Sequence, residues 1–233
     1  MNVITLAKKY AALLDETYRE NAKTAVLESD PALAREGANA NELVIPKLTM
    51  DGLANYSRNS GYVSGDVSLT WETVKFSYER GRMFSVDAMD NEESQSIAFG
   101  ALAGEFVRTK AVPELDAFRF AAIAGTDGIS KAEGKLETGE AAAAAVRKAV
   151  SAMDAAEVPS EDRVLFITPV LKGMIDDMDT TKSRAVMASF TDVVVVPQSR
   201  FYSAVKLADG VTDGEESGGY SKAAGAKNIN FMI

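Results

Sequence analysis

Apolar residues recur at intervals of three and four near the start of the chain, and this spacing predicts an amphipathic helix. Residues 3–20 repeat Leu6, Tyr10 and Leu13 in this way. Residues 21–41 lose the pattern and are rich in Ala, Asn, Asp and Glu. We therefore expect an amino-terminal helix followed by an arm that lies outside the core.

Residues 90–110 carry the signals of a second, longer helix. Asp90 and Glu93 have the spacing of a capping box, in which each side chain bonds the backbone N–H of the other residue. Arg108 and Lys110 lie in the last turn, where the helix dipole favours cations. An apolar face along the same residues predicts a helix that lies against a flat partner.

Pro113 predicts a break after this long helix, because proline suits the first turn of a new helix and lacks the N–H needed inside one. Glu114 and Asp116 follow it in that first turn, and Gly125 is expected to end the new helix. Its apolar face is expected to contain Leu115, Phe118 and Ala122.

Between these helical regions, residues 42–86 have the pattern of a long β-hairpin. Residues 42–50 form an apolar run with Pro46, which suits an edge strand. Residues 51–66 are rich in Gly, Asn and Ser and predict a flexible tip. A long two-stranded ribbon is only marginally stable alone in water, so we expect it to rest on a neighbouring subunit.

The second strand of this hairpin changes its phase. Apolar residues alternate from Val67 towards Val86, but they change sides between Trp71 and Val74. Because side chains along a strand alternate with a strict period of two, the change predicts a bulge or a sharp twist. Arg80 and Arg82 interrupt the apolar side and indicate a surface or an ion-pairing contact.

Residues 138–233 predict a compact α/β layer with its own core. Thr138 should cap an Ala-rich helix that stops before Pro159. Short β-branched runs predict strands, and a short helix is expected after Thr168. The predicted strands cover residues 163–168, 192–198, 200–208 and 228–233.

The composition of the chain excludes several classes of function. The 233 residues include no His and no Cys, so the chain cannot form a Ser-His-Asp triad, a Cys-His pair, a disulfide or a zinc site that uses either residue. Lys and Arg number 25 against 34 Asp and Glu, and the formal net charge of −9 disfavours a protein that wraps nucleic acid. We predict no catalytic residue, no cofactor, no metal and no membrane span.

Four segments resemble, in the same order, the major capsid proteins of tailed bacteriophages of the Hong Kong 97 type. They are IPKLTMDGLANYSRNSGYVSGDVSLTWETVKFSYERGRMFSVDAMDNEES, EFVRTKAVPELDAFRFAAIAG, DRVLFITPVLKGMI and GAKNINFMI. The resemblance covers most of residues 40–233. It implies an α+β fold of the Hong Kong 97 type.

The resemblance also implies a division of the chain into four parts. Residues 1–41 would be the N-terminal arm, and residues 42–86 the extended loop hairpin with strands of the peripheral domain. Residues 87–137 would be the spine helix and the rest of the peripheral domain, and residues 138–233 the axial domain. Family members usually continue beyond the position of NINFMI, so a truncated axial domain is expected.

The implied function is assembly of an icosahedral shell around the double-stranded DNA genome of a bacteriophage. Partners would be other copies in hexamers and pentamers, a scaffolding protein, a portal, and packaged DNA held without sequence-specific contacts. Shells would assemble in the bacterial host cytoplasm and become the virion capsid. The implied protein is structural and not an enzyme.

Contacts between copies are expected at the hairpin and at the long helix. Arginines of the hairpin could pair with carboxylates of a neighbour's helix, and tyrosines suit an interface because they join an aromatic body to a polar end. The candidate contact residues are Tyr56, Arg58, Asn59, Tyr62, Arg80, Arg82, Glu92, Glu93 and Glu105.

Two other functions fit the same sequence. An encapsulin-like cellular compartment would use the same fold to enclose an enzyme cargo. A carboxylate-dependent enzyme, for example a glycoside hydrolase with two Asp or Glu residues, needs neither His nor Cys.

Overall fold

The computed structural model describes residues 17–18, 21–28, 35–36, 41–84 and 97–233. The chain divides into two compact units: Glu28–Val86, the hairpin unit, and Met1–Leu27 with Asp87–Ile233, the α/β unit. The described residues form a mixed α+β structure, as the sequence predicts. The predicted capping box and almost all of the first predicted helix lie outside the described residues.

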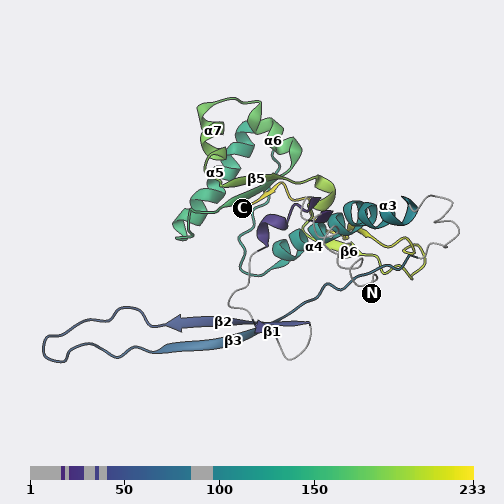
Figure 1. The fold of residues 1–233 in the computed structure, drawn as a ribbon. Coiled ribbons are helices and arrows are strands. Elements are labelled where there is room, and N and C mark those ends of the chain that lie inside the picture. Colours follow the sequence, from purple (N-terminus) through teal and green to yellow (C-terminus); the bar gives the residue numbers. More distant parts are fainter. Residues whose placement is uncertain (1–16, 19–20, 29–34, 37–40, 85–96) are drawn as a thin grey trace. The chain divides into compact units, whose positions relative to one another are not determined.

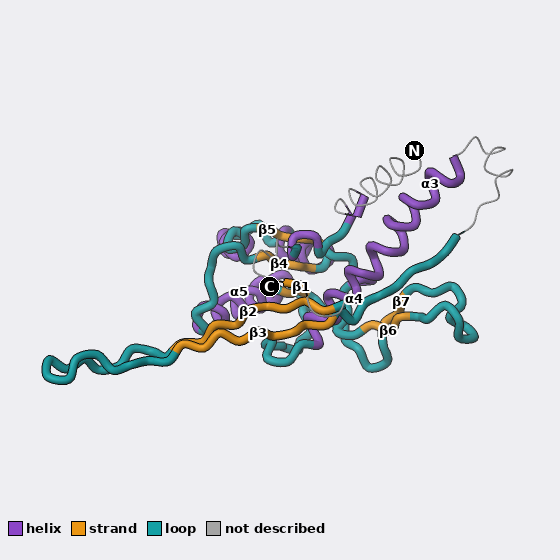
Figure 2. Tube along the Cα trace, turned by 60° about the horizontal axis from the view of Figure 1, so that its bottom comes forward, coloured by secondary structure: helices purple, strands orange, loops and turns teal. Residues whose placement is uncertain are grey.

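The hairpin unit contains a three-stranded antiparallel sheet in the order β1-β2-β3. Strands β2 (Glu42–Met50) and β3 (Val67–Lys75) pair along nine residues each and form the predicted hairpin. Figure 2 shows the two strands side by side, with the loop between them extending beyond their ends. Strand β1 (Arg35–Glu36) pairs with β2 only at Val44 and Leu43.

The predicted bulge in β3 is wrong. Pairing runs one-to-one from Met50 opposite Val67 to Glu42 opposite Lys75, so neither strand contains an extra residue. Leu69 and Trp71 lie on one face of the ribbon, and Val74 lies on the other face, opposite Leu43. Each face is therefore apolar over a different part of the ribbon. An apolar alternation fixes the register only where one face is buried, and every residue of β3 is exposed.

Two further expectations for the hairpin need correction. Strand β2 is the middle strand and not an edge strand, although Pro46 lies beyond the two residues that pair with β1. The alternation after residue 75 does not continue the strand, because β3 ends at Lys75 and residues 76–84 form neither helix nor strand.

The α/β unit is built on a sheet with the order β5-β4-β8. Strand β4 (Val164–Ile167) pairs parallel with β5 (Asp192–Val195) and antiparallel with β8 (Phe231–Met232). The strands predicted at 163–168, 192–198 and 228–233 are therefore confirmed in place, with shorter bounds. Beside the sheet, β6 (Val205–Leu207) and β7 (Tyr220–Lys222) form an antiparallel pair, so the strand predicted over 200–208 covers only three residues.

Helices cover both faces of the β5-β4-β8 sheet (Figure 1). One face carries α5 (Gly139–Ala155), α6 (Pro169–Asp176) and α7 (Thr181–Met187), and the other carries α4 (Val112–Gly125). The predicted cap of α5 is confirmed, because the Thr138 side chain accepts a hydrogen bond from the Ala141 N–H at 3.2 Å. Helix α7 was not predicted.

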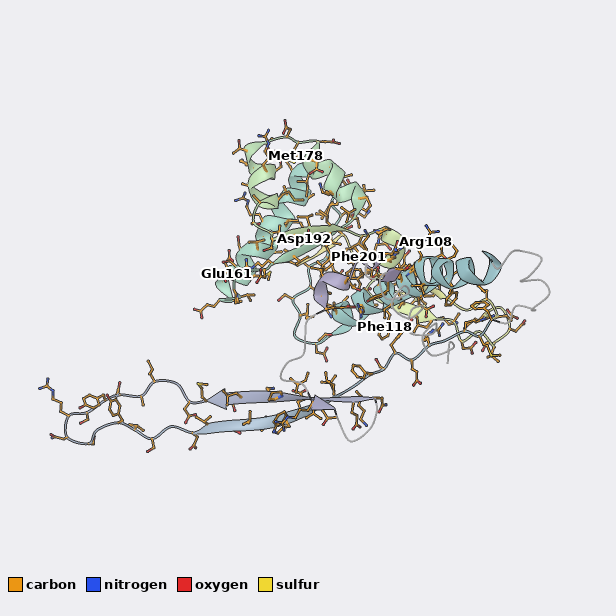
Figure 3. All side chains as sticks on the ribbon, viewed as in Figure 1. Arg108, Phe118, Glu161, Met178, Asp192 and Phe201 are labelled. Atoms are coloured by element: carbon orange, nitrogen blue, oxygen red, sulfur yellow. The ribbon has the colours of Figure 1, made fainter. Side chains whose placement is uncertain are left out.

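Alternation along β4 divides the core between the two faces. Leu165 and Ile167 join the buried residues of α5, α6 and α7. Phe166 points the other way and packs edge-on against Phe120 of α4, with ring centroids 5.2 Å apart. Phe201 completes this second cluster, where Figure 3 shows it beside the sheet. The core of the α/β layer therefore includes α4 and extends across the predicted boundary at residues 137 and 138.

The predicted break at Pro113 is wrong. Helix α3 (Ile97–Phe106) continues through a π-helical turn, η2 (Val107–Ala111), directly into α4. In this turn the Val112 N–H bonds the carbonyl oxygen of Val107, five residues earlier. Pro113 then falls at the start of the α-helical hydrogen-bond pattern, where a missing N–H costs little.

The predicted apolar face of α4 is also wrong. The buried residues of this helix include Val112, Asp116 and Phe120 at four-residue steps, whereas Ala122 is exposed. The prediction treated the carboxylate of Asp116 as a surface group of the first turn. Because Asp116 is fully buried, the side of α4 that faces the core is the one that contains Val112, Asp116 and Phe120.

Candidate assembly surface

The outer part of the β2–β3 ribbon, from Pro46 to Met50 and from Val67 to Trp71, has one apolar face. Cross-strand neighbours share a face of an antiparallel pair, so the apolar side chains oppose one another along the ribbon. The paired residues on this face are Met50 with Val67, Leu48 with Leu69, and Pro46 with Trp71. The opposite face has polar side chains at the same level, in the pairs Thr49 with Ser68 and Lys47 with Thr70.

This apolar face is exposed in the chain. Leu48 and Leu69 expose 55% and 56% of their surface, and Met50 and Val67 expose still more. Trp71 is covered partly by the Arg35 guanidinium, which lies 4.7 Å from the ring centroid. Contiguous exposed apolar side chains on a soluble protein typically mark a surface that binds a partner.

The tip of the hairpin is held together at its base by two aspartates. The Asp66 N–H donates to Asp51 Oδ2 at 2.8 Å, and the Asp51 N–H donates to the Asp66 carbonyl oxygen at 3.1 Å. Farther out, Ser57 and Gly61 form an isolated bridge that closes a tight turn, and Gly61 takes a positive φ of 76°. These bonds close the base of the tip and the turn at its end.

Four of the candidate contact residues lie together at this tip. Tyr56 and Tyr62 stack at a tilt, with ring centroids 4.9 Å apart, and both are exposed. Arg58 and Asn59 lie in the turn between them and are exposed too. Arg58 is the only charged residue in 52–64, so the tip joins two aromatic rings to a single positive charge.

The other candidate residues do not gather at this tip. Arg80 and Arg82 are exposed on the segment after β3. Glu105 pairs with Arg108 on the next turn of its own helix, and both side chains remain more than half exposed. Glu92 and Glu93 lie outside the described residues.

The α/β unit contains a buried polar cluster that the sequence analysis did not predict. Asp116 is fully buried, and its Oδ1 accepts from the Thr24 N–H at 3.1 Å and the Thr24 hydroxyl at 2.7 Å. Its Oδ2 accepts from the Lys23 N–H at 3.0 Å and from Arg200 Nη1 at 3.1 Å. We call Asp116, Lys23, Thr24 and Arg200 the Asp116 cluster.

Two further residues extend the Asp116 cluster. Arg119 Nη1 donates to the Thr24 hydroxyl oxygen at 3.0 Å and to the Tyr18 hydroxyl oxygen at 2.7 Å. The Tyr220 hydroxyl donates to the Ser199 carbonyl oxygen at 2.9 Å, next to Arg200. Burial raises the pKa of Tyr220 above its ordinary value, so this hydroxyl keeps its proton and remains a donor.

The sequence contained a signal for this cluster. Asp116 lies midway between Val112 and Phe120 at four-residue steps, so an acid interrupts an otherwise apolar stripe. A carboxylate there is buried only if donors surround it. The donors come from residues 23–24 and from Arg200, about ninety residues away on either side, which no local pattern identifies. Thr24 is fully buried, although residues 21–41 were expected outside the core.

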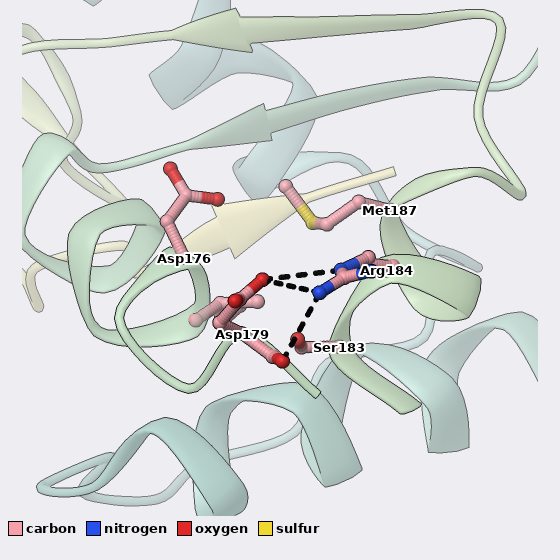
Figure 4. A pocket seen from close by; sticks show the side chains of 6 residues that line it. Asp176, Asp179, Ser183, Arg184 and Met187 are labelled. Carbon is pink, nitrogen blue, oxygen red and sulfur yellow. Dashed lines mark hydrogen bonds and ion pairs between the residues drawn. The ribbon is translucent and has the colours of Figure 1, made fainter. Parts of the chain in front are cut away.

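A shallow depression of about 190 Å³ lies between α6 and α7 (Figure 4). Asp179 and Arg184 face each other across it, with Arg184 Nη2 at 2.6 Å from Asp179 Oδ1. Asp176, which also lines it, is paired with Lys172 at 2.5 Å. The depression is smaller than the roughly 300–1,000 Å³ typical of ligand pockets, and both of its acids have cationic partners.

Among the residues that the structure describes, no group of three or more acidic side chains could hold a metal ion. No helix within the same residues is long and apolar enough to cross a membrane. Comparison of the chain with known protein families, with curated proteins and with solved structures found no match.

Proposed function

We propose that this chain is the major capsid protein of a tailed bacteriophage, with the Hong Kong 97 fold, and that its copies form an icosahedral shell. The observation that carries the proposal is the exposed apolar face of the β2–β3 ribbon. A two-stranded ribbon has no core of its own, and its apolar face is stabilised only when another surface covers it. A repeated shell supplies that surface from a neighbouring copy.

The order of the elements supports the same proposal. An extended hairpin, β2–β3, precedes a long helix, α3–η2–α4, and a mixed α/β layer follows. In the sequence resemblance these elements correspond to the extended loop, the spine helix and the axial domain. The axial part of each copy would meet its equivalents in hexamers and pentamers.

The proposed contact places the apolar face of one copy's ribbon over the helix 90–110 of a neighbour. Arg58 at the hairpin tip would then pair with a carboxylate of that helix. Glu105 already has Arg108 as a partner on its own helix, so Glu92 and Glu93 are the better candidates. Each exposed ion pair contributes less than about 1 kcal/mol, and the covered apolar area supplies most of the binding free energy.

The remaining partners follow from the proposed role. The shell would enclose double-stranded DNA without sequence-specific contacts, which suits a chain with a formal net charge of −9. A scaffolding protein and a portal would direct its closure in the bacterial host cytoplasm. We propose a structural role with no catalytic step, in keeping with a chain that contains no His and no Cys.

Light scattering and negative-stain microscopy of the purified chain, over a range of concentrations, test the proposal. We expect the purified chain to form capsomers or closed particles. Particles isolated from infected cells should contain DNA. A monomer that never associates would contradict it. Particles that hold a protein cargo and no genome would indicate an encapsulin-like compartment. Hydrolysis of glycosides by a monomer would indicate the carboxylate-dependent enzyme.

Deletion of residues 52–64 tests the hairpin separately. The deletion removes the tip but leaves all nine β2–β3 residue pairs and the α/β unit. We expect unchanged thermal unfolding of the α/β unit together with a loss of particles. Normal particles from the deleted chain would show that the hairpin tip is not part of the assembly contact.

A further inference from the structure

The two edges of the β1-β2-β3 sheet differ from each other. Among the described residues, no strand lies beyond β3, and every residue of β3 is exposed. On the other side, β1 pairs with β2 at Val44, and Pro46 in β2 has no N–H to donate. The β2 edge is therefore partly paired and interrupted, whereas the β3 edge is open.

The open edge of β3 carries backbone donors and acceptors at every second residue. The Asp51 N–H bonds the Asp66 carbonyl oxygen at 3.1 Å. The Phe76 N–H bonds the Asn41 carbonyl oxygen at 2.9 Å, so the even-numbered residues of this strand bond β2. In an antiparallel pair the residues between them direct their N–H and C=O groups away from the partner strand. These outward-directed residues are Val67, Leu69, Trp71, Thr73 and Lys75.

Strand β3 lacks the features that block an open edge in other proteins. Such edges usually carry a proline, a bulge or several charges, because an unprotected edge pairs readily with another strand. Strand β3 contains no Pro, its pairing with β2 has no bulge, and its charged residues are only Glu72 and Lys75. These properties fit an edge that pairs with a further strand.

The strand that matches this edge best is β3 of a second copy. A partner must be extended over a similar length and must have an open edge of its own. Strands β1 and β4 to β8 span two to four residues each, and Pro46 interrupts the outer edge of β2. Within the part of the chain that the structure describes, β3 alone offers nine residues and an open edge.

The side chains of β3 complement a second β3 when the strands run antiparallel about a two-fold axis. Because outward-directed residues must pair with one another, the axis passes through a single residue. An axis at Thr70 places Leu69 opposite Trp71 of the second copy and Trp71 opposite its Leu69. The same axis places Glu72 opposite Ser68, so no like charges meet.

The neighbouring registers match less well. An axis at Leu69 would place Asp66 opposite Glu72, and an axis at Glu72 would place two copies of that carboxylate opposite each other. An axis at Trp71 would leave Leu69 opposite Thr73. The first register alone pairs apolar with apolar residues at its centre and keeps the acids apart.

We propose that β3 pairs with β3 of a second copy, antiparallel about a two-fold axis at Thr70. The pairing joins two three-stranded sheets into one, and the Leu69–Trp71 pairs connect the apolar faces of the two ribbons. It uses the edge of the ribbon and leaves the apolar face available to another surface. The pairing requires two copies but no shell, so it does not depend on the proposed capsid function.

Hydrogen exchange of the wild-type chain tests whether the edge is paired. The Leu69 and Trp71 N–H groups point away from β2, whereas those of Thr70 and Glu72 bond it. We expect the outward amides to exchange at least about tenfold faster than the bonded amides in dilute chain, and the difference to disappear when copies associate. A difference that persists in the associated chain would contradict pairing through this edge.

Disulfide formation between introduced cysteines tests the second copy and its register. The chain contains no Cys, so any link involves the introduced residue. On the two-fold axis the Cα atoms of the two Thr70 residues would lie roughly 4.5 Å apart, which is within disulfide reach. We expect Thr70→Cys, treated with an oxidant, to give at least about tenfold more linked dimer than Thr49→Cys. Thr49 is the matched control, because it is exposed and lies on the same face of the ribbon in β2.

The outcomes separate the pairing from the capsid proposal. Equal amounts of linked dimer from Thr70→Cys and Thr49→Cys would refute the register and the two-fold axis. Protected outward amides without such a link would assign the edge to a different segment. A dimer linked at position 70 that never forms particles would support the pairing and contradict only the capsid function. Particles in which the outward amides stay unprotected would support the capsid function and contradict the pairing.

Discussion

Leu48 and Leu69 face each other across the ribbon, and each exposes more than half of its surface. Two leucines in this position add little to the stability of the isolated chain, because water still covers them. They contribute to stability only when another surface excludes that water. Burying a leucine side chain contributes roughly 1.5–3 kcal/mol, and assembly repeats that gain at every contact between copies.

The double substitution of Leu48→Ser and Leu69→Ser should therefore separate folding from assembly. We expect thermal unfolding to shift little and the concentration needed for particles to rise at least about tenfold. Val211→Ser is the matched control, because Val211 is 85% exposed but lies outside the ribbon. Light scattering across a concentration series measures particle formation, and a thermal melt measures unfolding, for the double variant and for the control. Equal effects of the double variant and the control would contradict a specific role for the apolar face.

Charge reversal tests the proposed pairing of the tip with a neighbour's helix. Arg58→Glu should weaken assembly, because the sole charge of the tip would then face carboxylates. Glu93→Arg in the same chain should restore part of the loss. Particle yield at low and at high salt is the measurement, and the difference between variants should shrink as salt screens the charges. A double variant as impaired as Arg58→Glu alone would exclude Glu93 as the partner.

The positions of the hairpin and the α/β strands were predictable because their signals are local. Residues 51–66 carry the turn-forming residues of a tip, and the β4 and β5 runs are nearly continuous in apolar residues. The false bulge arose because an exposed ribbon does not enforce one apolar side along its length. The false break at Pro113 arose because a π-helical turn places the proline where no N–H is needed.

Local spacing could indicate that Asp116 is buried, but not which residues surround it. Its donors come from segments that meet only after folding, and an acid in the first turn of a helix usually satisfies the helix dipole. The candidate assembly residues were found by the opposite route. Tyr56, Arg58, Asn59 and Tyr62 lie within one short loop, so sequence proximity alone brings them together.

Gly139 should be essential to the packing of α5 on α6. A Cβ at this position would lie 2.2 Å from the carbonyl oxygen of Met174 and 2.8 Å from the Met178 side chain. Gly139→Ala should lower the free energy of unfolding by about 1–3 kcal/mol, because a backbone carbonyl cannot move aside as a flexible side chain does. Gly173→Ala is the control, since a Cβ there meets nothing within 4 Å. It should be neutral or stabilise the helix by up to about 1 kcal/mol. Chemical denaturation of both variants measures the difference, and equal stabilities would contradict the close approach.

Arg163 should stabilise the turn between α5 and β4. This nearly buried guanidinium donates to the carbonyl oxygens of Pro159 and Val158 at 2.8 and 2.6 Å, and to Asp154 Oδ1 at 2.7 Å. Arg163→Ala removes all three bonds and the packing of the side chain, and should destabilise the chain by about 3 kcal/mol. Asp154→Asn should cost less than about 1 kcal/mol, because Asp154 is more than half exposed. Similar losses in the two variants would assign the effect to the ion pair and not to the backbone contacts.

Asp209 organises the turn between β6 and β7, and its ionisation should follow from its hydrogen bonds. The Thr212 hydroxyl and the Thr212 and Val211 N–H groups donate to its carboxylate, and they lower the pKa of Asp209 to about 2. A lowered pKa in the folded state stabilises the turn above pH ~3.8, and this contribution is lost as the pH falls through about 2. Thr212→Val removes the largest of these bonds and should raise the pKa of Asp209 towards its ordinary value. Carbon-detected NMR titration of the carboxyl group measures both pKa values. Identical titration curves for the variant and the wild-type chain would show that the hydroxyl does not bond the carboxylate in solution.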